Sequence, residues 1–432
     1  MRILLLLLLA LVTVPVNTSP GTAYVVTRGD AVVRVEGVGR DGNGALVTPD
    51  TPMRVASISK SFTAAAVLTL VDEGRVALDQ PVAGYLPEFR MADARAGAIT
   101  VRQLLNQTSG LADSTVDIPA TQRAGDLRGY VAALRRGRLA ADPGTRWAYC
   151  NVNYDLAARL VEVVDGRPFA EAMRERVFRP LGMSDSSVGG ATADGYNSIF
   201  GVWVARAELP GFRGGAGGVV TTAADMGRWL ISQTGHGPQI VSAGSLRVMH
   251  TPGAAAGDYG MGWGVEHAKG RALLVHSGNL FTYTAVEAID PATGEGWAVM
   301  TNSAALNDPT YDQLLALVDG GAYQPLDRRR QVIEGVLGAV ALIAIGLGLL
   351  GVRRARRWRG RLWRLLPALI PVAVFAAYPQ WVSVLTNHRT VTWPQLVYFA
   401  APLTITLGVA ALAGLATVVA RLWARRSVGS AR

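Results

Sequence analysis

Three long apolar stretches in the last quarter of the chain constrain its fold more than any other feature. They cover residues 332–352, 365–386 and 396–420. A helix needs about 20 apolar residues to cross a bilayer. Core helices of globular domains are rarely so long or so free of charge. We therefore predict three transmembrane helices over these ranges.

Arginines flank these stretches unevenly. Residues 353–364 and the tail 421–432 together hold eleven arginines and no acid, so the net charge of +10 leaves about −1 for the rest. The high pI therefore indicates how the chain is oriented in the membrane, and it does not indicate nucleic-acid binding. We predict that both basic segments are cytoplasmic and that the connection 386–395 lies outside. Arg328, Arg329 and Arg330, just outside the first stretch, are the one feature that disagrees.

The N-terminus resembles an export signal. Arg2 precedes the apolar run 3–16, and polar residues follow it. We take residues 1–23 as a signal peptide with cleavage after Ala23, with Thr18 as an equal alternative. A buried first helix or strand is the other interpretation of the run. Because Cys150 is the only cysteine, an intrachain disulfide and a lipidation cysteine after the signal are both excluded.

Residues 24–320 have the pattern of one α/β domain. Residues 24–38 predict two strands that turn at Gly29 and Asp30, and residues 271–302 predict strands again. The part between them is mainly helical, and one more helix closes the domain at 310–318. Strands at both chain ends around a helical middle suggest one sheet built from both ends. Residues 321–331 form a linker. The helical patterns of the middle cover residues 100–105, 126–134, 154–164 and 169–177.

The run from Ser57 to Lys60 is an S-x-x-K at the start of an apolar helix, which we predict over residues 62–71, ended by Gly74. Residues three apart share a helix face, so the two side chains can touch. A lysine in a dry pocket can help to activate a serine, and a helix N-terminus favours an oxyanion. Two lysines produce such a motif by chance in about one chain in ten, so the motif alone is weak.

Two further motifs follow in order. Tyr149, Cys150 and Asn151 form a Y-x-N, and His276 opens His-Ser-Gly on a predicted strand. The order S-x-x-K, Y-x-N, H/K-x-G resembles the serine β-lactamase and penicillin-binding superfamily, and the tyrosine resembles its class C β-lactamase-like branch. That branch includes D-alanyl-D-alanine carboxypeptidases, D-aminopeptidases and esterases. The resemblance covers residues 24 to 319. It also includes the runs 100–111, 180–183, 217–225 and 300–302.

The resemblance implies a fold and a mechanism. The fold is an α/β class C β-lactamase-like domain, with an antiparallel sheet from both chain ends and a helical subdomain, followed here by the three transmembrane helices. Ser57 becomes acylated, and Lys60 supplies the field that keeps Tyr149 partly ionised or shares its proton. Tyr149 then acts as general base on the serine and later on water, because a phenol becomes useful beside a cation.

The resemblance also implies the substrate-binding residues. Asn151 binds a substrate carbonyl and orients the lysine. The backbone N–H of Asn279 forms the oxyanion hole with that of the nucleophile. His276, with Ser277 and Gly278, lines the site. A histidine replaces the lysine of typical class C enzymes, which predicts poor β-lactamase activity and a charge that appears on acidification from pH 7.5 to 5.5.

Each feature has a simpler interpretation. Tyr149 and Asn151 can belong to a strand-to-helix turn, and His276 can be a core histidine. The glycine run 214–218 lacks the context of a phosphate loop, so we predict a tight active-site turn. Cys150 is interpreted as a packed side chain. The other histidines lack metal-ligand spacing, so no metal and no cofactor are predicted.

We conclude that the sequence predicts a membrane-anchored, extracytoplasmic serine hydrolase that acts on amide or ester bonds through an acyl-enzyme. Its expected partners are a small-molecule or peptide substrate with a scissile carbonyl and the lipid bilayer, without nucleic acid. The alternative is a penicillin-binding-like sensor that acylates without efficient turnover. A scaffold without chemistry fits less well, because reactive residue types fill every motif position.

Overall fold

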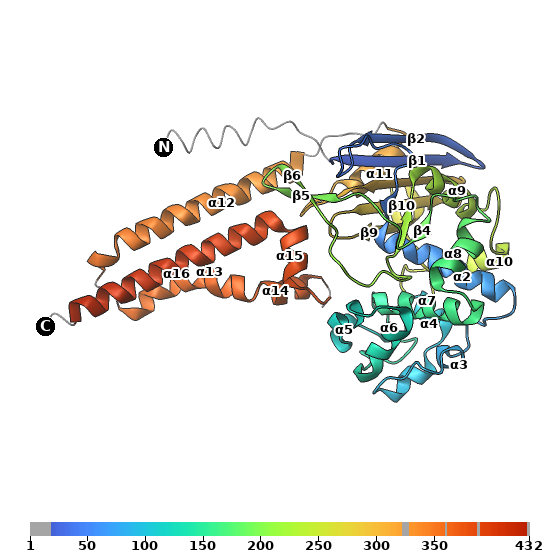
Figure 1. Cartoon of the computed structure of the whole chain (residues 1–432), viewed down its shortest axis with the longest axis horizontal. Helices are drawn as coiled ribbons and strands as arrows, with labels where there is room; N and C mark the ends of the chain where they lie inside the picture. Colours follow the sequence, from blue (N-terminus) through green and yellow to red (C-terminus); the bar gives the residue numbers. More distant parts are fainter. Residues whose placement is uncertain (1–18, 322–327, 359–360, 387–388, 430–432) are drawn as a thin grey trace.

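The computed structural model describes residues 19–321, 328–358, 361–386 and 389–429 (Figure 1). The apolar run expected to be an export signal lies outside these residues. We call residues 19–321 the N-terminal domain and residues 328–429 the C-terminal helical region. The long helices of the second extend away from the first along one direction (Figure 1).

A six-stranded antiparallel sheet forms the centre of the N-terminal domain, as predicted from both chain ends. The N-terminal strand β1 pairs with the late strand β11, with Tyr24 opposite Val299. The hairpin between β1 and β2 turns at Gly29, in the left-handed region at φ 58°. The strand order is β2 (Ala31–Gly39), β1 (Gly21–Arg28), β11 (Glu295–Thr301), β10 (Thr284–Asp290), β9 (Arg271–Asn279) and β8 (Gly264–Ala268).

Both faces of this sheet are buried. Side chains alternate between the faces of a strand, so Val25 and Ala285 lie on one face while Tyr24 and Val286 lie on the other. The first face packs with α2 (Ser59–Asp72) and α9 (Ala223–Gln233), and the second packs on α11 (Thr310–Val318). The predicted apolar helix is α2, which is buried along nearly its whole length. It therefore carries its first residues to the centre of the domain.

A helical subdomain covers the end of α2, with α7 (Asn151–Asp165) at its centre. Two small sheets join it to the main sheet, one of β3 (Met53–Arg54), β7 (Val219–Thr221) and β4 (Ser187–Val188), the other of β12 (Ser303–Ala304), β5 (Gly195–Ile199) and β6 (Val202–Arg206). The remaining helices are α3 (Val82–Tyr85), α4 (Val101–Leu105), α5 (Ile118–Gln122), α6 (Leu127–Ala133), α8 (Phe169–Met173), α10 (Ala243–His250), the π-helix η5 (Arg174–Phe178) and the 3-10 turns η1 (Ala56–Ile58), η2 (Ala94–Ala98), η3 (Asp113–Thr115) and η4 (Leu134–Arg136).

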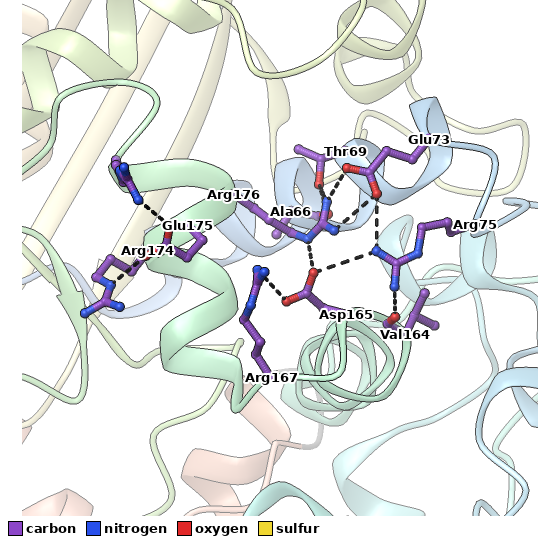
Figure 2. Close-up of polar contacts among 11 residues, drawn as sticks. Ala66, Thr69, Glu73, Arg75, Val164, Asp165, Arg167, Arg174, Glu175 and Arg176 are labelled. Carbon is purple, nitrogen blue, oxygen red and sulfur yellow. Dashed lines mark hydrogen bonds and ion pairs between the residues drawn. The ribbon is translucent and has the colours of Figure 1, made fainter.

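An ion-pair network ties the C-terminal ends of α2 and α7 to η5 (Figure 2). Asp165, whose side chain is 1% exposed, lies 2.6 Å from Arg176 Nε and 3.3 Å from Arg167. Arg176 also reaches Glu73 at 2.8 Å, and Arg75 approaches both acids. Because buried charges need partners, this network fixes the ends of the helices that carry the motifs.

The C-terminal helical region contains two helices that are long and apolar enough to cross a membrane alone, α12 (Arg328–Arg353) and α16 (Ala401–Gly429). A third span exists if α13 (Leu366–Ala376) and α14 (Tyr378–Leu385) act together, because they bend by 60° at their break. Pro379 follows this break, and proline cannot donate the backbone bond that continues a helix. The short helix α15 (Trp393–Phe399) precedes α16, so the long helix within the third expected span begins at Ala401. The 3-10 turns η6 (Ala355–Arg357) and η7 (Leu362–Leu365) flank the basic connection.

Close packing holds α16 against its two neighbours. A Cβ atom on Gly348 would come 2.8 Å from Ala413 Cβ, and one on Gly414 would come 2.1 Å from Ala368 O. Small residues of this kind let membrane helices approach closely. The three long segments therefore form one packed unit, seen side by side in Figure 1.

The first turn of α12 is docked on the N-terminal domain. Arg330 and Glu334 are each 1% exposed and lie 3.6 Å apart. Glu334 accepts hydrogen bonds from Ser198 Oγ at 2.9 Å and Gly201 N–H at 2.6 Å, and the Arg330 guanidinium lies 4.4 Å from the centre of the Trp203 ring. Arg330, which seemed to disagree with the predicted topology, is thus a neutralised docking residue.

The start of β1 bears on the expected signal peptide. Ala23 is buried and pairs with Met300 in the sheet. Cleavage after Ala23 would remove the first three residues of β1, whereas cleavage after Thr18 would leave the strand complete.

Candidate active site

Ser57 lies in the 3-10 turn η1, directly before α2. The preceding residue, Ala56, has a left-handed backbone at φ 49°, which is unusual for a residue with a Cβ and is found mostly at functional sites. Lys60 lies in the first turn of α2, and its Nζ donates a hydrogen bond to Ser57 Oγ at 2.9 Å. The predicted contact is present, although the helix begins two residues after the serine.

Strand β9 runs against this turn. A Cβ on Gly278 would lie 2.1 Å from Val55 O and 3.0 Å from Ser57 N, so glycine is required for the close approach. Ser277 and Asn279 flank it and are exposed at the edge of the site. The expected oxyanion donors, the N–H groups of Ser57 and Asn279, thus belong to two segments in direct contact.

Lys60 is fully buried. Besides Ser57, its Nζ donates to Ala216 O at 2.8 Å, and it lies 4.8 Å from the centre of the Tyr149 ring. Burial lowers the pKa of Lys60, while Tyr149 and then Asp155 oppose the shift. A lysine whose charge is weakened in this way can exchange a proton with its neighbours.

The glycine run 214–218 forms the predicted active-site turn. It presents Ala216 O to Lys60, and α2 holds it through Thr63 Oγ1, which donates to Gly215 O at 2.9 Å. Asp155 accepts from Ala216 N–H at 3.1 Å. Burial raises the pKa of Asp155 to about 6. Sequence analysis missed Asp155, whose only signal is its place one helical turn after Asn151.

The loop before α7 carries Tyr149. Gln107 orders this loop, because its backbone O accepts from Ala148 N–H at 2.9 Å and its Oε1 accepts from Cys150 N–H at 3.0 Å. Asn151 is the first residue of α7, and its Oδ1 is buried without a hydrogen-bond partner within the described structure. Asn151 was expected to orient Lys60, but in the structure Lys60 Nζ donates to Ala216 O instead. Asn151 Oδ1 therefore remains available to other partners.

Cys150 behaves as the packed side chain expected from the sequence. It is fully buried and unpaired. Burial raises the pKa of its thiol well above the usual value, so the nucleophilic thiolate is disfavoured.

His276 lies on β9, buried beside the other motif residues, with its ring centre 6.4 Å from that of Tyr149. Its Nδ1 lies 2.7 Å from Ser277 O and its Nε2 lies 3.1 Å from the Tyr259 hydroxyl. A carbonyl can only accept, so we assign the proton to Nδ1. Burial first, and then Lys60, lower the pKa of His276 to about 3. The expected charge at pH 5.5 is therefore wrong: the imidazole stays neutral. Tyr259 was not identified from the sequence.

Glu287 on β10 lies behind the serine turn and was also missed. It is fully buried, and burial raises its pKa to about 8. Its carboxyl lies 2.8 Å from Ser61 Oγ and 3.0 Å from Trp229 Nε1, while Ser61 donates to Ile58 O at 2.8 Å. A protonated Glu287 satisfies every partner, because its O–H can donate to Ser61.

A residue of the C-terminal helical region completes the surroundings of Tyr149. The Arg389 guanidinium lies 5.1 Å from the centre of the Tyr149 ring, and its Nε lies 2.7 Å from Asp113 Oδ2. Nothing in the local sequence around Arg389 signals this approach.

These features define a site of the serine hydrolase type, in which a half-buried serine faces a buried lysine and a tyrosine. The profile of the Beta-lactamase family matches residues 12–320. The chain is 33% identical over 313 residues to penicillin-binding protein 4 of Amycolatopsis lactamdurans, a match that covers 66% of this chain and 81% of that protein. The chain therefore belongs to the Beta-lactamase family and is a serine hydrolase of that family.

Solved structures agree with this family assignment. The octameric penicillin-binding protein homologue from Pyrococcus abyssi superposes with a TM-score of 0.61 at 25% identity, covering 75% of this chain and 78% of that one. The D-amino acid amidase from Ochrobactrum anthropi SV3, complexed with L-phenylalanine amide, gives 0.58 at 25% identity, covering 74% and 94%.

Proposed function

We propose that this protein is a membrane-anchored, extracytoplasmic hydrolase that cleaves amide or ester bonds through an acyl-enzyme on Ser57. The observation that carries the proposal is the buried Lys60, whose Nζ donates to Ser57 Oγ at 2.9 Å beside the Tyr149 ring. The similarity to a D-amino acid amidase supports a small substrate with a scissile amide.

Acylation begins at the serine. Ser57 Oγ attacks the substrate carbonyl while its proton passes to the Tyr149 oxygen, which the Lys60 cation favours as phenolate. The carbonyl oxygen becomes an oxyanion that the N–H groups of Ser57 and Asn279 stabilise. The tetrahedral intermediate collapses, and the leaving amine or alcohol takes the proton from Tyr149. Water then attacks the ester with Tyr149 again as base, which releases the acid and restores Ser57.

The other motif residues bind the substrate. The unpartnered Oδ1 of Asn151 is available to a substrate N–H, while its amide group can donate to a carbonyl. His276 is neutral, so it contributes hydrogen bonding and shape rather than a permanent charge. This arrangement favours substrates that do not require a cation from the third motif.

We also propose the arrangement in the membrane. Cleavage of the signal after Thr18 leaves a hydrolase domain that ends near residue 320, a linker, three spans and a cytoplasmic tail from about residue 421. The start of α12 and the connection before α15 both contact the N-terminal domain, and the basic connection 353–364 lies at the other end of α12 (Figure 1). The predicted placement of arginines in the cytoplasm then puts the hydrolase domain outside.

Labelling of the full chain in detergent tests the nucleophile. A fluorophosphonate probe should add one adduct at Ser57, and Ser57→Ala should remove it. Cys150→Ser is the matched control and should label like the wild type. An adduct at Ser59 or Cys150 would overturn the assignment.

Intact-mass measurement over a panel of amides, esters and β-lactams distinguishes an enzyme from a sensor. Adducts that form and disappear with release of product indicate turnover. An adduct that persists with every acylating compound would instead indicate the penicillin-binding-like sensor.

A further inference from the structure

Two residues between α14 and α15, Arg389 and Thr390, reach the edge of the active site. Arg389 Nε lies 2.7 Å from Asp113 Oδ2, and Thr390 Oγ1 lies 3.4 Å from Asp113 O. Asp113 is 8% exposed and lies in η3, near the loop that carries Tyr149. Two neighbouring side chains of the C-terminal helical region therefore each contact Asp113.

Helix α15 is docked on the same side. Tyr398 lies beneath Arg206, with the centre of its ring 3.6 Å from the guanidinium carbon Cζ. The Tyr398 hydroxyl lies 3.3 Å from Ala207 O. The ring of Phe281, two residues after Asn279, lies 5.6 Å from that of Tyr398 and 5.4 Å from that of Phe399. These contacts hold the connection in place beside the third motif.

Several titratable groups face Tyr149 from the elements around it. Lys60 of α2 and Arg389 are cations near the ring, at 4.8 and 5.1 Å from its centre. His276 of β9 is neutral, as are Tyr154 of α7 and Tyr259, whose pKa values burial raises. Among the acids, Asp113 pairs with Arg389, and Asp155 acts on Lys60. The third motif thus brings no charge to Tyr149, and Arg389 brings one.

We propose that Arg389 is a positioning residue of the active site, which holds the Tyr149 ring beside Lys60. The inference rests on the proposed function, in which Tyr149 is the general base. The membrane-side connection thereby completes a site that the N-terminal domain builds only in part. A guanidinium 5.1 Å from the centre of an aromatic ring is attracted to that ring, and the contact with Asp113 fixes where this guanidinium lies.

The test is the rate constant with which a fluorophosphonate labels Ser57 in the full chain in detergent. Arg389→Gln should lower this rate constant about 10-fold or more, because a small misplacement of a catalytic group can cost up to about 100-fold. Arg389→Lys keeps a cation beside the ring and should restore much of the rate. A merely structural role would lower the amount of labelled protein without changing the rate constant of the protein that labels.

Arg206→Gln is the matched control, because it loosens α15 without removing a charge beside Tyr149. Its rate constant should match that of the wild type. Equal losses of rate in Arg206→Gln and Arg389→Gln would assign the effect to docking and overturn the proposal, as would an unchanged rate constant in Arg389→Gln. Failure of the wild type to label at Ser57 would instead refute the proposed function itself.

Discussion

The two regions of this molecule use the same apolar residue types in opposite ways. In the N-terminal domain Leu68 and Ile289 are 0% exposed, whereas in the C-terminal helical region Ile343 is 62% and Leu412 is 69% exposed. The first arrangement removes apolar surface from water, and the second leaves apolar surface exposed on helices that are long and apolar enough to cross a membrane. This difference is what the proposed membrane arrangement requires, with a water-facing domain and lipid-facing helices.

The two regions meet through charged residues. Glu334 bound by Ser198 and Gly201, Arg206 over the Tyr398 ring, and Arg389 with Asp113 connect them. Buried ion pairs require accurate geometry, since an unpaired partner is costly. The C-terminal helical region is therefore fixed relative to the active site, and the following predictions test that relation.

The largest expected effect concerns the side of the membrane. A reporter that works only in the cytoplasm should give a strong signal when fused after Trp358 and none when fused after Gly320. The reason is the eleven arginines of the basic connection and tail. The opposite pattern would place the hydrolase domain inside the cell and would refute the proposed orientation of the two regions.

Breaking the docking pair should have the next largest effect. Glu334→Gln removes the carboxylate charge that lies 3.6 Å from the buried Arg330 guanidinium, which we expect to destabilise the full chain in detergent by about 3–5 kcal/mol. Thermal unfolding measures this change. The control is Arg329→Gln, whose side chain is 79% exposed and should cost under about 1 kcal/mol. Equal melting of both variants would show that the docking is dispensable.

The core of the N-terminal domain gives a pH-dependent prediction. The pKa of Glu287 is about 8 in the folded state against an ordinary 4.5, so the folded protein holds more protons between these values. Its contribution to stability is full below pH 4.5 and is lost as the pH rises towards 8.

Glu287→Gln should therefore gain stability relative to the wild type over that window, by up to about 1.4 kcal/mol per pH unit. Denaturant unfolding at pH 5, 6.5 and 8 measures the difference. Parallel curves for the two proteins would mean that Glu287 is ionised in the folded state.

The smallest effect is expected at the ion-pair network far from the membrane helices. Arg176→Met removes hydrogen bonds to Asp165 and Glu73, while Asp165 keeps Arg75 and Arg167 (Figure 2). We expect a loss of about 1–3 kcal/mol in the free energy of unfolding. Arg174→Met, at a side chain that is 64% exposed, is the control and should change it by under about 1 kcal/mol. If the free energy of unfolding falls no more than in the control, the network contributes little to stability.

Much of the fold followed from local patterns. The strands on both sides of Gly29, the buried helix α2 and the closing helix α11 lie where the periodicity placed them. Boundaries were less accurate: α13 ends at Ala376, three residues before Pro379, inside an apolar run that the sequence alone shows as continuous. Hydropathy measures composition, and it does not register a bend.

The sequence by itself predicted the reactive residues, because Ser57, Lys60 and Tyr149 belong to motifs with fixed spacing, and it located the long apolar helices, because length and composition suffice for them. Only the tertiary structure decided that His276 is neutral and that Arg389 lies beside Tyr149. The physical reason is that burial and electrostatic contact depend on groups far apart along the chain. A residue type states what chemistry is available, and its surroundings in the fold set the protonation state in which that chemistry is used.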